Sequence, residues 1–333
     1  MRILILYNAG SGHRWVSFPA YLKALSALDA RVETRTVPRS FDLKELLTDA
    51  GSFDRVVVAG GDGTVAAVAG ILKHSGIPIV AYPGGTANLL ARNLGMPFQP
   101  EALANVTLNG PALATDLGEI EYLRYSRREA FRGRFMKRRV AGTPVIVSFC
   151  VMAGCGFPAA LMHHAKPLKP TWGEAAYWMS ACWSLFPRRA RLRLVLDGRE
   201  VLVKGIGVLI MNFGEIQFDL KVMPGTHAHD GIFGVAVVKS GTLFGLIPLL
   251  WNAVLERMGF RRQREPEMME TYHAASLEIE SRPPLKIQFD GEVLSKASRF
   301  KARVCPGAVT YVFGTKVPTD IYQKADASKG TGV

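Results

Sequence analysis

Three glycines and an aspartate stand together at residues 60–64, in the sequence GGDGT, directly after the apolar run of residues 56–59. Glycine lets a ligand approach the backbone closely, and the start of a helix offers unpaired N–H groups and a positive dipole end. Asp62 adds a carboxylate where a phosphate and a divalent ion would meet. Thr64 is a candidate N-cap of the helix expected over residues 65–74. The pattern predicts a phosphate-binding turn, although an ordinary strand-to-helix turn uses the same residue types.

Two more glycine-rich loops follow short apolar runs. The run of residues 3–7 is followed by NAGSG at residues 8–12, and the run of residues 77–82 is followed by PGGTAN at residues 83–88. Such loops meet at one edge of a parallel sheet, where α/β folds bind their ligands. The chain has neither the GxxxxGK[ST] of a P-loop nor the GxGxxG of a Rossmann fold, so another kind of nucleotide triphosphate site is predicted. Its candidate residues are Asn8, Ser11, Gly12, Gly60, Gly61, Asp62, Gly63, Thr64, Gly85, Thr86 and Asn88.

A second group of carboxylates lies late in the chain, in the sequence DGE of residues 290–292. Asp290 and Glu292 could hold a metal ion or take a proton from a hydroxyl. As a hairpin turn, Asp290-Gly291 needs no further role. No cysteine or histidine stands at zinc-binding spacing, so the candidate chemistry rests on carboxylates.

The elements that must position these residues differ between the two halves. In the first half, strands are expected at residues 3–7, 32–37, 56–59 and 77–82, alternating with helices at 15–28, 41–50, 65–74 and 89–94. This alternation predicts a parallel sheet with helices on both faces. In the second half, strands dominate, at residues 145–152, 191–196, 201–211, 232–238, 275–279, 285–289 and 299–304. Helices are expected there only near residues 171–186 and 242–260.

The second half should be mainly antiparallel, because Asp197-Gly198 and Asp290-Gly291 are typical type I′ hairpin turns. We therefore expect an α/β domain over residues 1–120 and a β-rich domain over residues 121–310. A C-terminal segment, residues 311–333, could pack back on the first domain and should end in a frayed tail.

The net charge of +13 over 333 residues indicates an anionic partner. The segment from Tyr122 to Arg139 holds eight basic residues with interleaved aromatics, which suits an anionic membrane surface; a solvated loop that serves solubility is an equal alternative. Nucleic acid is not the expected partner, and a homodimer is left open. The N-terminus lacks a signal-peptide pattern, so we expect a cytoplasmic protein, peripheral at the inner membrane face if it meets a lipid.

With these motifs in place, the sequence resembles the diacylglycerol kinase catalytic-domain family, which includes bacterial lipid kinases and the sphingosine kinases. NAGSG resembles the family's Asn-Pro-x-Ser-Gly loop, GGDGT is its most recognisable motif, and GGTAN resembles its Gly-Thr-x-Asn loop. Further matches are residues 116–118 (DLG), 223–231 (MPGTHAHDG) and 289–292 (FDGE). Ala9, His13 and Leu89 depart from the pattern, and Leu89 replaces an acid of diacylglycerol-specific members, which leaves the acceptor open.

The resemblance implies an α/β nucleotide domain of NAD kinase or diacylglycerol kinase type, followed by a β-sandwich-like antiparallel domain, with ATP and Mg²⁺ between them. It implies transfer of the γ-phosphoryl group of ATP to a hydroxyl of a diacylglycerol-like or other lipid. Asp290 is favoured as the general base, with Asp62 as the alternative. Glu292 and Asp62 would position metal and phosphates, and Asp116 would support the metal. An NAD kinase-like or other small-molecule kinase, and a non-catalytic lipid or nucleotide sensor, are the competing hypotheses.

Overall fold

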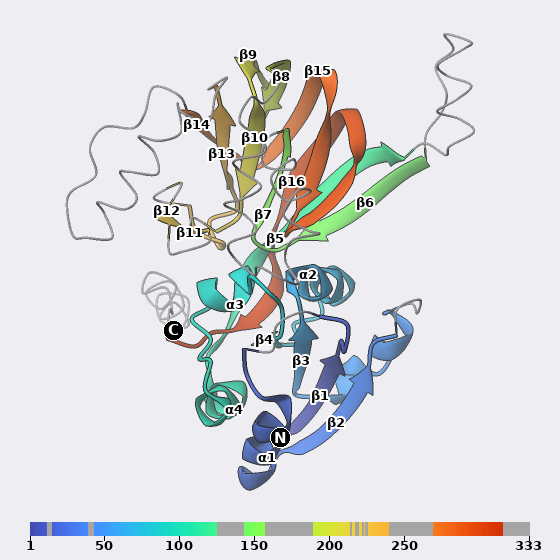
Figure 1. Ribbon diagram of the computed structural model, residues 1–333, viewed down its shortest axis with the longest axis vertical. Coiled ribbons are helices and arrows are strands. Elements are labelled where there is room, and N and C mark those ends of the chain that lie inside the picture. Colours follow the sequence, from blue (N-terminus) through green and yellow to red (C-terminus); the bar gives the residue numbers. More distant parts are fainter. Residues whose placement is uncertain are drawn as a thin grey trace, which may run out of the picture. The chain divides into compact units, whose positions relative to one another are not determined.

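The computed structural model describes residues 1–11, 15–38, 43–124, 143–156, 189–213, 215–216, 220–221, 223, 226–239 and 269–315. The chain forms two compact units (Figure 1). Unit 1 comprises Met1–Asp116 and Pro306–Val333, and unit 2 comprises Leu117–Cys305. The chain enters unit 2 within the long strand β5 (Ala112–Arg124) and leaves it within β16 (Glu292–Val312).

Unit 1 is built on a parallel sheet with the strand order β2-β1-β3-β4. Val57 of β3 lies beside Ile5 of β1 and Val80 of β4, and all three side chains are fully buried. A strand covered on both faces needs apolar residues at successive positions, which explains the VVVAG sequence. The predicted parallel sheet is confirmed. Its strands are β1 (Arg2–Tyr7), β2 (Arg31–Thr36), β3 (Arg55–Gly60) and β4 (Ile79–Pro83), joined by the C-terminal end of β16.

Four α-helices belong to the described part of unit 1. They are α1 (Phe18–Ala27), α2 (Asp62–Ile71), α3 (Leu89–Asn93) and α4 (Pro100–Asn109). Helix α1 packs on α4, where the hydroxyls of Tyr21 and Thr107 share a buried hydrogen bond of 2.8 Å. Helix α4 was not predicted, although Pro100 at its first turn is a typical helix start.

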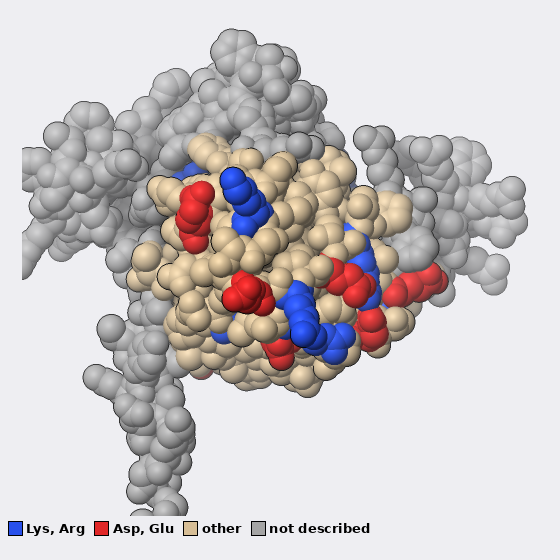
Figure 2. Space-filling view, turned by 90° about the horizontal axis from the view of Figure 1, so that it is seen from below, with Lys and Arg blue, Asp and Glu red and all other residues tan. Residues whose placement is uncertain are grey.

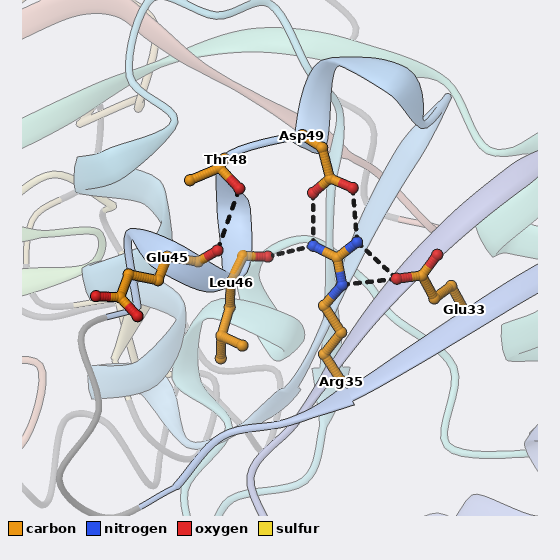
Figure 3. Close-up of polar contacts among 6 residues, drawn as sticks. All are labelled: Glu33, Arg35, Glu45, Leu46, Thr48 and Asp49. Atoms are coloured by element: carbon orange, nitrogen blue, oxygen red, sulfur yellow. Dashed lines mark hydrogen bonds and ion pairs between the residues drawn. The ribbon is translucent and has the colours of Figure 1, made fainter.

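The helix predicted over residues 41–50 is wrong. The described part of this segment instead forms two 3₁₀ turns, Glu45–Leu47 and Ala50–Ser52. Arg35 of β2 explains the difference, because its guanidinium donates to the Leu46 carbonyl at 2.7 Å and binds both oxygens of Asp49 at 2.6 and 2.7 Å (Figure 3). Backbone and side-chain groups of the segment therefore turn toward the edge strand and do not continue a helix.

Helix α2 begins earlier than predicted. Asp62 is its first residue and Gly61 its N-cap, so the assignment of Thr64 as N-cap is wrong. The N–H groups of Thr64 and Val65 donate to the Gly61 carbonyl at 2.9 and 3.1 Å. The shift moves the GGDGT motif into the first turn of the helix, where N–H groups and the helix dipole favour an anion.

Unit 2 is an antiparallel β domain, as predicted. One sheet runs in the order β14-β13-β10-β7-β15, and β15 also pairs with β8 and β16. Its core includes Phe149 and Phe233, whose rings stack with centroids 5.4 Å apart. Besides β5 and β16, its strands are β6 (Thr143–Phe149), β7 (Met152–Gly156), β8 (Ala190–Leu196), β9 (Arg199–Gly205), β10 (Gly207–Met211), β11 (Glu215–Ile216), β12 (Leu220–Lys221), β13 (Phe233–Val238), β14 (Met269–Ala274) and β15 (Ser276–Phe289).

Both predicted hairpin turns are present. Asp197 and Gly198 join β8 to β9 with φ of 46° and 89°, and Asp290 and Gly291 join β15 to β16 with φ of 41° and 83°. Two positive φ values in succession are what a type I′ turn requires. The Asp197 carboxylate also accepts hydrogen bonds from the N–H groups of Ala275 and Ser276.

Several strand boundaries differ from the prediction. The runs over residues 145–152 and 201–211 are each two strands, broken at 150–151 and at Ile206, while residues 275–279 and 285–289 join in β15. The helices predicted near residues 171–186 and 242–260 lie outside the described residues. Within the described ranges, no helix is long and apolar enough to cross a membrane.

Candidate functional site

Unit 1 brings the three glycine-rich loops together at the carboxyl ends of β1, β3 and β4. The side-chain amide of Asn8 donates to the Thr64 hydroxyl at 3.0 Å, which joins the first loop to helix α2. The Ser11 hydroxyl donates to the carbonyls of Asn8 and Gly84 at 2.9 and 3.1 Å, which joins the first loop to the third. Gly12, the last residue of NAGSG, lies outside the described residues.

Two of the glycines are required by close packing within and between the loops. A Cβ atom on Gly85 would lie 2.7 Å from the Gly61 Cα, and a Cβ on Gly60 would lie 2.9 Å from the Thr64 Cβ. Real Cβ contacts of that length essentially do not occur, so a larger residue would displace the Gly61 backbone at Gly85 and the Thr64 side chain at Gly60. The second and third loops therefore touch through their backbones, and only glycine fits there.

The loop after β4 buries an amide group without a complete set of partners. Asn88 has a φ of 50° and is 3% exposed. Its Oδ1 accepts a hydrogen bond from the Gly85 N–H at 2.7 Å, but its Nδ2 has no hydrogen-bond partner. Buried donors are nearly always paired. An unpaired N–H donor among these loops is therefore suited to a phosphate oxygen.

Two candidate carboxylates of unit 1 are held by backbone N–H groups. Asp62, in the first turn of α2, accepts from the Leu90 N–H at 3.0 Å. Asp116 is 2% exposed and accepts from the Gly307 N–H at 2.8 Å. Gly63, Thr64 and Thr86 are half-buried. The sequence did not indicate the bond from Leu90, because no motif marks a backbone donor.

In unit 2, Asp290 is held more tightly than any sequence pattern indicated. Its Oδ2 accepts from the Cys150 N–H at 2.6 Å, and its Oδ1 accepts from the N–H groups of Val151 and Met152 at 3.0 Å each. The side chain is 5% exposed. Three N–H donors stabilise the charged carboxylate. Glu292, two residues on, is exposed at the start of β16.

The predicted metal-binding residues come from both units, Asp62 and Asp116 from unit 1 and Glu292 from unit 2. Among the described residues, no group of three or more His, Cys, Asp or Glu side chains is clustered as a metal site. Their role with a metal stays a prediction. A thiol nucleophile is not indicated at Cys155, because burial raises its pKa to about 12.

The basic segment from Tyr122 to Arg139 is described only as far as Arg124. Tyr122 was interpreted as one of its membrane-facing aromatics, and that interpretation is wrong because Tyr122 is 7% exposed and packs in the core of unit 2. On the described surface seen from below, acidic and basic side chains lie side by side (Figure 2). That surface therefore does not show where an anionic partner would bind.

Two family models match this chain in the comparison with known proteins. The model of the diacylglycerol kinase catalytic domain matches residues 2–120, and that of the YegS C-terminal NAD kinase beta sandwich-like domain matches residues 151–313. The first part of the chain, residues 2–120, is therefore similar to the catalytic domain of diacylglycerol kinases. The predicted fold class is confirmed by the same matches.

Three similar proteins have related names. A diacylglycerol kinase of Mycobacterium tuberculosis is 25% identical over 308 residues, which cover 87% of this chain and 88% of that protein. A probable YegS-like lipid kinase of Pseudomonas fluorescens is 28% identical over 306 residues, with the same coverage of 87% and 88%. A crystal structure of a diacylglycerol kinase from Bacillus anthracis superimposes with a TM-score of 0.68 at 17% identity, over 95% of this chain and 98% of that one. This last likeness concerns the fold alone.

Proposed function

We propose that this protein is an ATP- and Mg²⁺-dependent lipid kinase, which transfers the γ-phosphoryl group of ATP to a hydroxyl of a diacylglycerol-like or other lipid acceptor. The observation that carries the proposal is the loop cluster of unit 1, with its buried, unpaired Asn88 Nδ2. The match to the diacylglycerol kinase catalytic domain and the names of the relatives, diacylglycerol kinase and lipid kinase, support the kinase activity and the lipid acceptor.

The nucleotide phosphates would lie against the backbone of Gly60, Gly61 and Gly85, at the N-terminus of α2. There the helix N–H groups and the Asn88 amide supply donors for phosphate oxygens. Bound Mg²⁺ would neutralise charge on the phosphates, and the Asp62 and Asp116 carboxylates are oxygen ligands of the kind it prefers. Phosphoryl transfer passes through a loose transition state, so catalysis here would come mostly from positioning and charge neutralisation.

In unit 2, Asp290 is the proposed general base and Glu292 a proposed metal ligand. A base must be ionised before it can accept a proton, and the three N–H donors on Asp290 favour that form. The same donors hold the carboxylate in one orientation. We expect the contribution of this base to be about 100-fold, within the usual 10²–10⁴-fold range.

The nucleotide part of the proposal can be tested at Asn88. An Asn88→Asp variant has the same shape, tolerates the positive φ, and keeps the oxygen that accepts from Gly85. It replaces the unpaired donor by a second carboxylate oxygen, which repels phosphate. We expect ATP affinity, measured by calorimetry with Mg²⁺, to fall by roughly 100-fold or more, about 2.7 kcal/mol. Unchanged affinity for ATP would show that the phosphates do not bind at this loop.

A soluble acceptor remains the main alternative, and the segment after β5 distinguishes it from a lipid. Arg124 and Thr143 are cross-strand partners of β5 and β6, so an Asn-Gly turn can replace residues 125–142 without disturbing the strands. For a peripheral enzyme at the inner membrane face, this deletion should reduce binding to anionic vesicles and preserve ATP binding. Vesicle binding equal to that of the intact chain would argue against membrane attachment through this segment. A sensor without activity would bind ATP and transfer no phosphate.

A further inference from the structure

A second buried amide without partners lies in unit 2, at Gln288 of β15. The side chain is fully buried, and neither Nε2 nor Oε1 has a hydrogen-bond partner. A buried amide in this state has lost its hydrogen bonds to water and gained none in return. Such groups are rare in folded proteins and call for a missing water or ligand.

Gln288 points away from the core of the β domain. Its neighbours Ile287 and Phe289 pack in that core, opposite Cys155 and Ala153 of β7. Because side chains alternate along a strand, Gln288 lies on the other face of the sheet. Its partner across the strand pair is Gly154, which has no side chain to cover the amide.

This face of the sheet is apolar next to Gln288. A cross-strand row leads from Gln288 through Gly154 of β7 and Leu209 of β10 to Ala236 of β13, strands that follow one another in the sheet (Figure 1). The row spans three strand spacings, about 14 Å. Ala236 belongs to a buried cluster with Met211 and Met223. Flexible methionine side chains can rearrange around hydrocarbon of varied shape.

Asp290 lies two residues beyond Gln288, in the turn that follows β15, so the two Cα atoms are at most about 7 Å apart. The glycerol unit between a free hydroxyl and the nearest ester of an acylglycerol can span such a distance. The order along this part of unit 2 is therefore a carboxylate, a buried amide and an apolar row. A lipid acceptor has the matching order of a hydroxyl, an ester and a hydrocarbon chain.

We propose that Gln288 is a specificity-determining residue that hydrogen-bonds an ester carbonyl of the lipid acceptor through Nε2. The inference rests on the proposed lipid kinase function. The hydrocarbon would follow the row from Leu209 to Ala236, with the reactive hydroxyl directed toward Asp290. Gln288 takes no part in the transfer of phosphate, so its removal should change the choice of acceptor and leave nucleotide binding intact.

A Gln288→Met variant tests the first half of this inference without any lipid. Methionine matches the length of glutamine and needs no hydrogen bond, so the ligand-free protein should become more stable. We expect Tm to rise by on the order of 2–5 °C. Ile287→Val, the next residue along β15 but in the core, should lower Tm. A lower Tm for Gln288→Met would show that the amide is already satisfied in the free protein, and would overturn the inference.

The second test compares dioleoylglycerol with its dialkyl ether, which lacks the carbonyls, as acceptors in mixed micelles. The intact enzyme should prefer the ester in kcat/KM by roughly tenfold, the worth of one hydrogen bond. Gln288→Met should lose this preference because its kcat/KM for the ester falls. Its KM for ATP should stay unchanged. Ile287→Val should keep the preference.

The outcomes separate the inference from the function on which it rests. If the intact protein transfers no phosphate to a lipid, the proposed function and the inference are both wrong. If it labels dioleoylglycerol and Gln288→Met shows the same ester preference, the function stands and the role of Gln288 falls. Higher Tm with unchanged preference would identify a site filled by water only, and would also overturn the inference.

Discussion

Replacement of Asp290 by asparagine should destabilise unit 2, besides any effect on catalysis. The carboxylate accepts from the N–H groups of Cys150, Val151 and Met152 at 2.6–3.0 Å, and it is 5% exposed. An asparagine has one acceptor oxygen, which can serve the two N–H groups now bonded to Oδ1. Its NH₂ group would then face the Cys150 N–H, which would remain buried and unpaired.

The magnitude follows from these contacts. One hydrogen bond to a charged group contributes about 1.5–3 kcal/mol, and a buried unpaired N–H costs about 1–3 kcal/mol. We therefore expect Asp290→Asn to lower the free energy of unfolding by about 3–5 kcal/mol. For a domain of this size, that corresponds to a fall in Tm on the order of 10 °C.

Urea unfolding followed by circular dichroism measures the effect. Asp230→Asn is a matched control, because Asp230 also accepts two backbone N–H bonds in a turn but is exposed. It should lose less than about 1 kcal/mol. If Asp290→Asn unfolds at the urea concentration of the intact protein, or loses no more stability than the control, the triple hydrogen bond described for Asp290 is incorrect.

Two further predictions concern the nucleotide loops and the hairpin at Asp197. Gly85→Ala would place a Cβ 2.7 Å from the Gly61 Cα, so ATP binding measured by calorimetry should weaken roughly tenfold or more, while Gly51→Ala, with open space around it, should bind normally. At Asp197, desolvation raises the pKa, but bonds from the N–H groups of Ala275 and Ser276 outweigh it, and the pKa is lowered. Because the pKa of Asp197 in the folded state lies below the unfolded value of about 3.9, the ionised carboxylate stabilises the fold at pH values above about 3.9. This stabilisation is lost as the pH falls further. The stability difference between the intact protein and Asp197→Asn, from urea unfolding, should thus be constant from pH 7 to 5 and shrink below about pH 4; a difference that grows below pH 4 would contradict this.

The sequence was informative where one local pattern decides the structure. The apolar runs of β1, β3 and β4 have no competing interpretation, and the loops that follow them are close in space because parallel strands end at one edge. The Asp-Gly pairs at 197–198 and 290–291 likewise form the predicted turns, since few other residues accept two positive φ values.

Other features depended on contacts between distant residues and could not be predicted. The 3₁₀ turns near Glu45 follow from the reach of the Arg35 guanidinium, and the break after β6 places three N–H groups against Asp290, about 140 residues away. The sequence FCVM of residues 149–152 contains no turn residue that would mark this break. The hidden amides of Asn88 and Gln288 also depend on burial, which residue type alone does not reveal.

The most direct test of the proposed function is transfer of ³²P from labelled ATP, with Mg²⁺, to a total lipid extract. Asp62→Ala and Asp290→Asn are assayed alongside, at a temperature where both variants are folded. We predict a labelled, chloroform-soluble product with the intact protein, and its loss or a fall of about 100-fold with each variant. Label only in a water-soluble product, or no transfer by the intact protein, would contradict a lipid kinase.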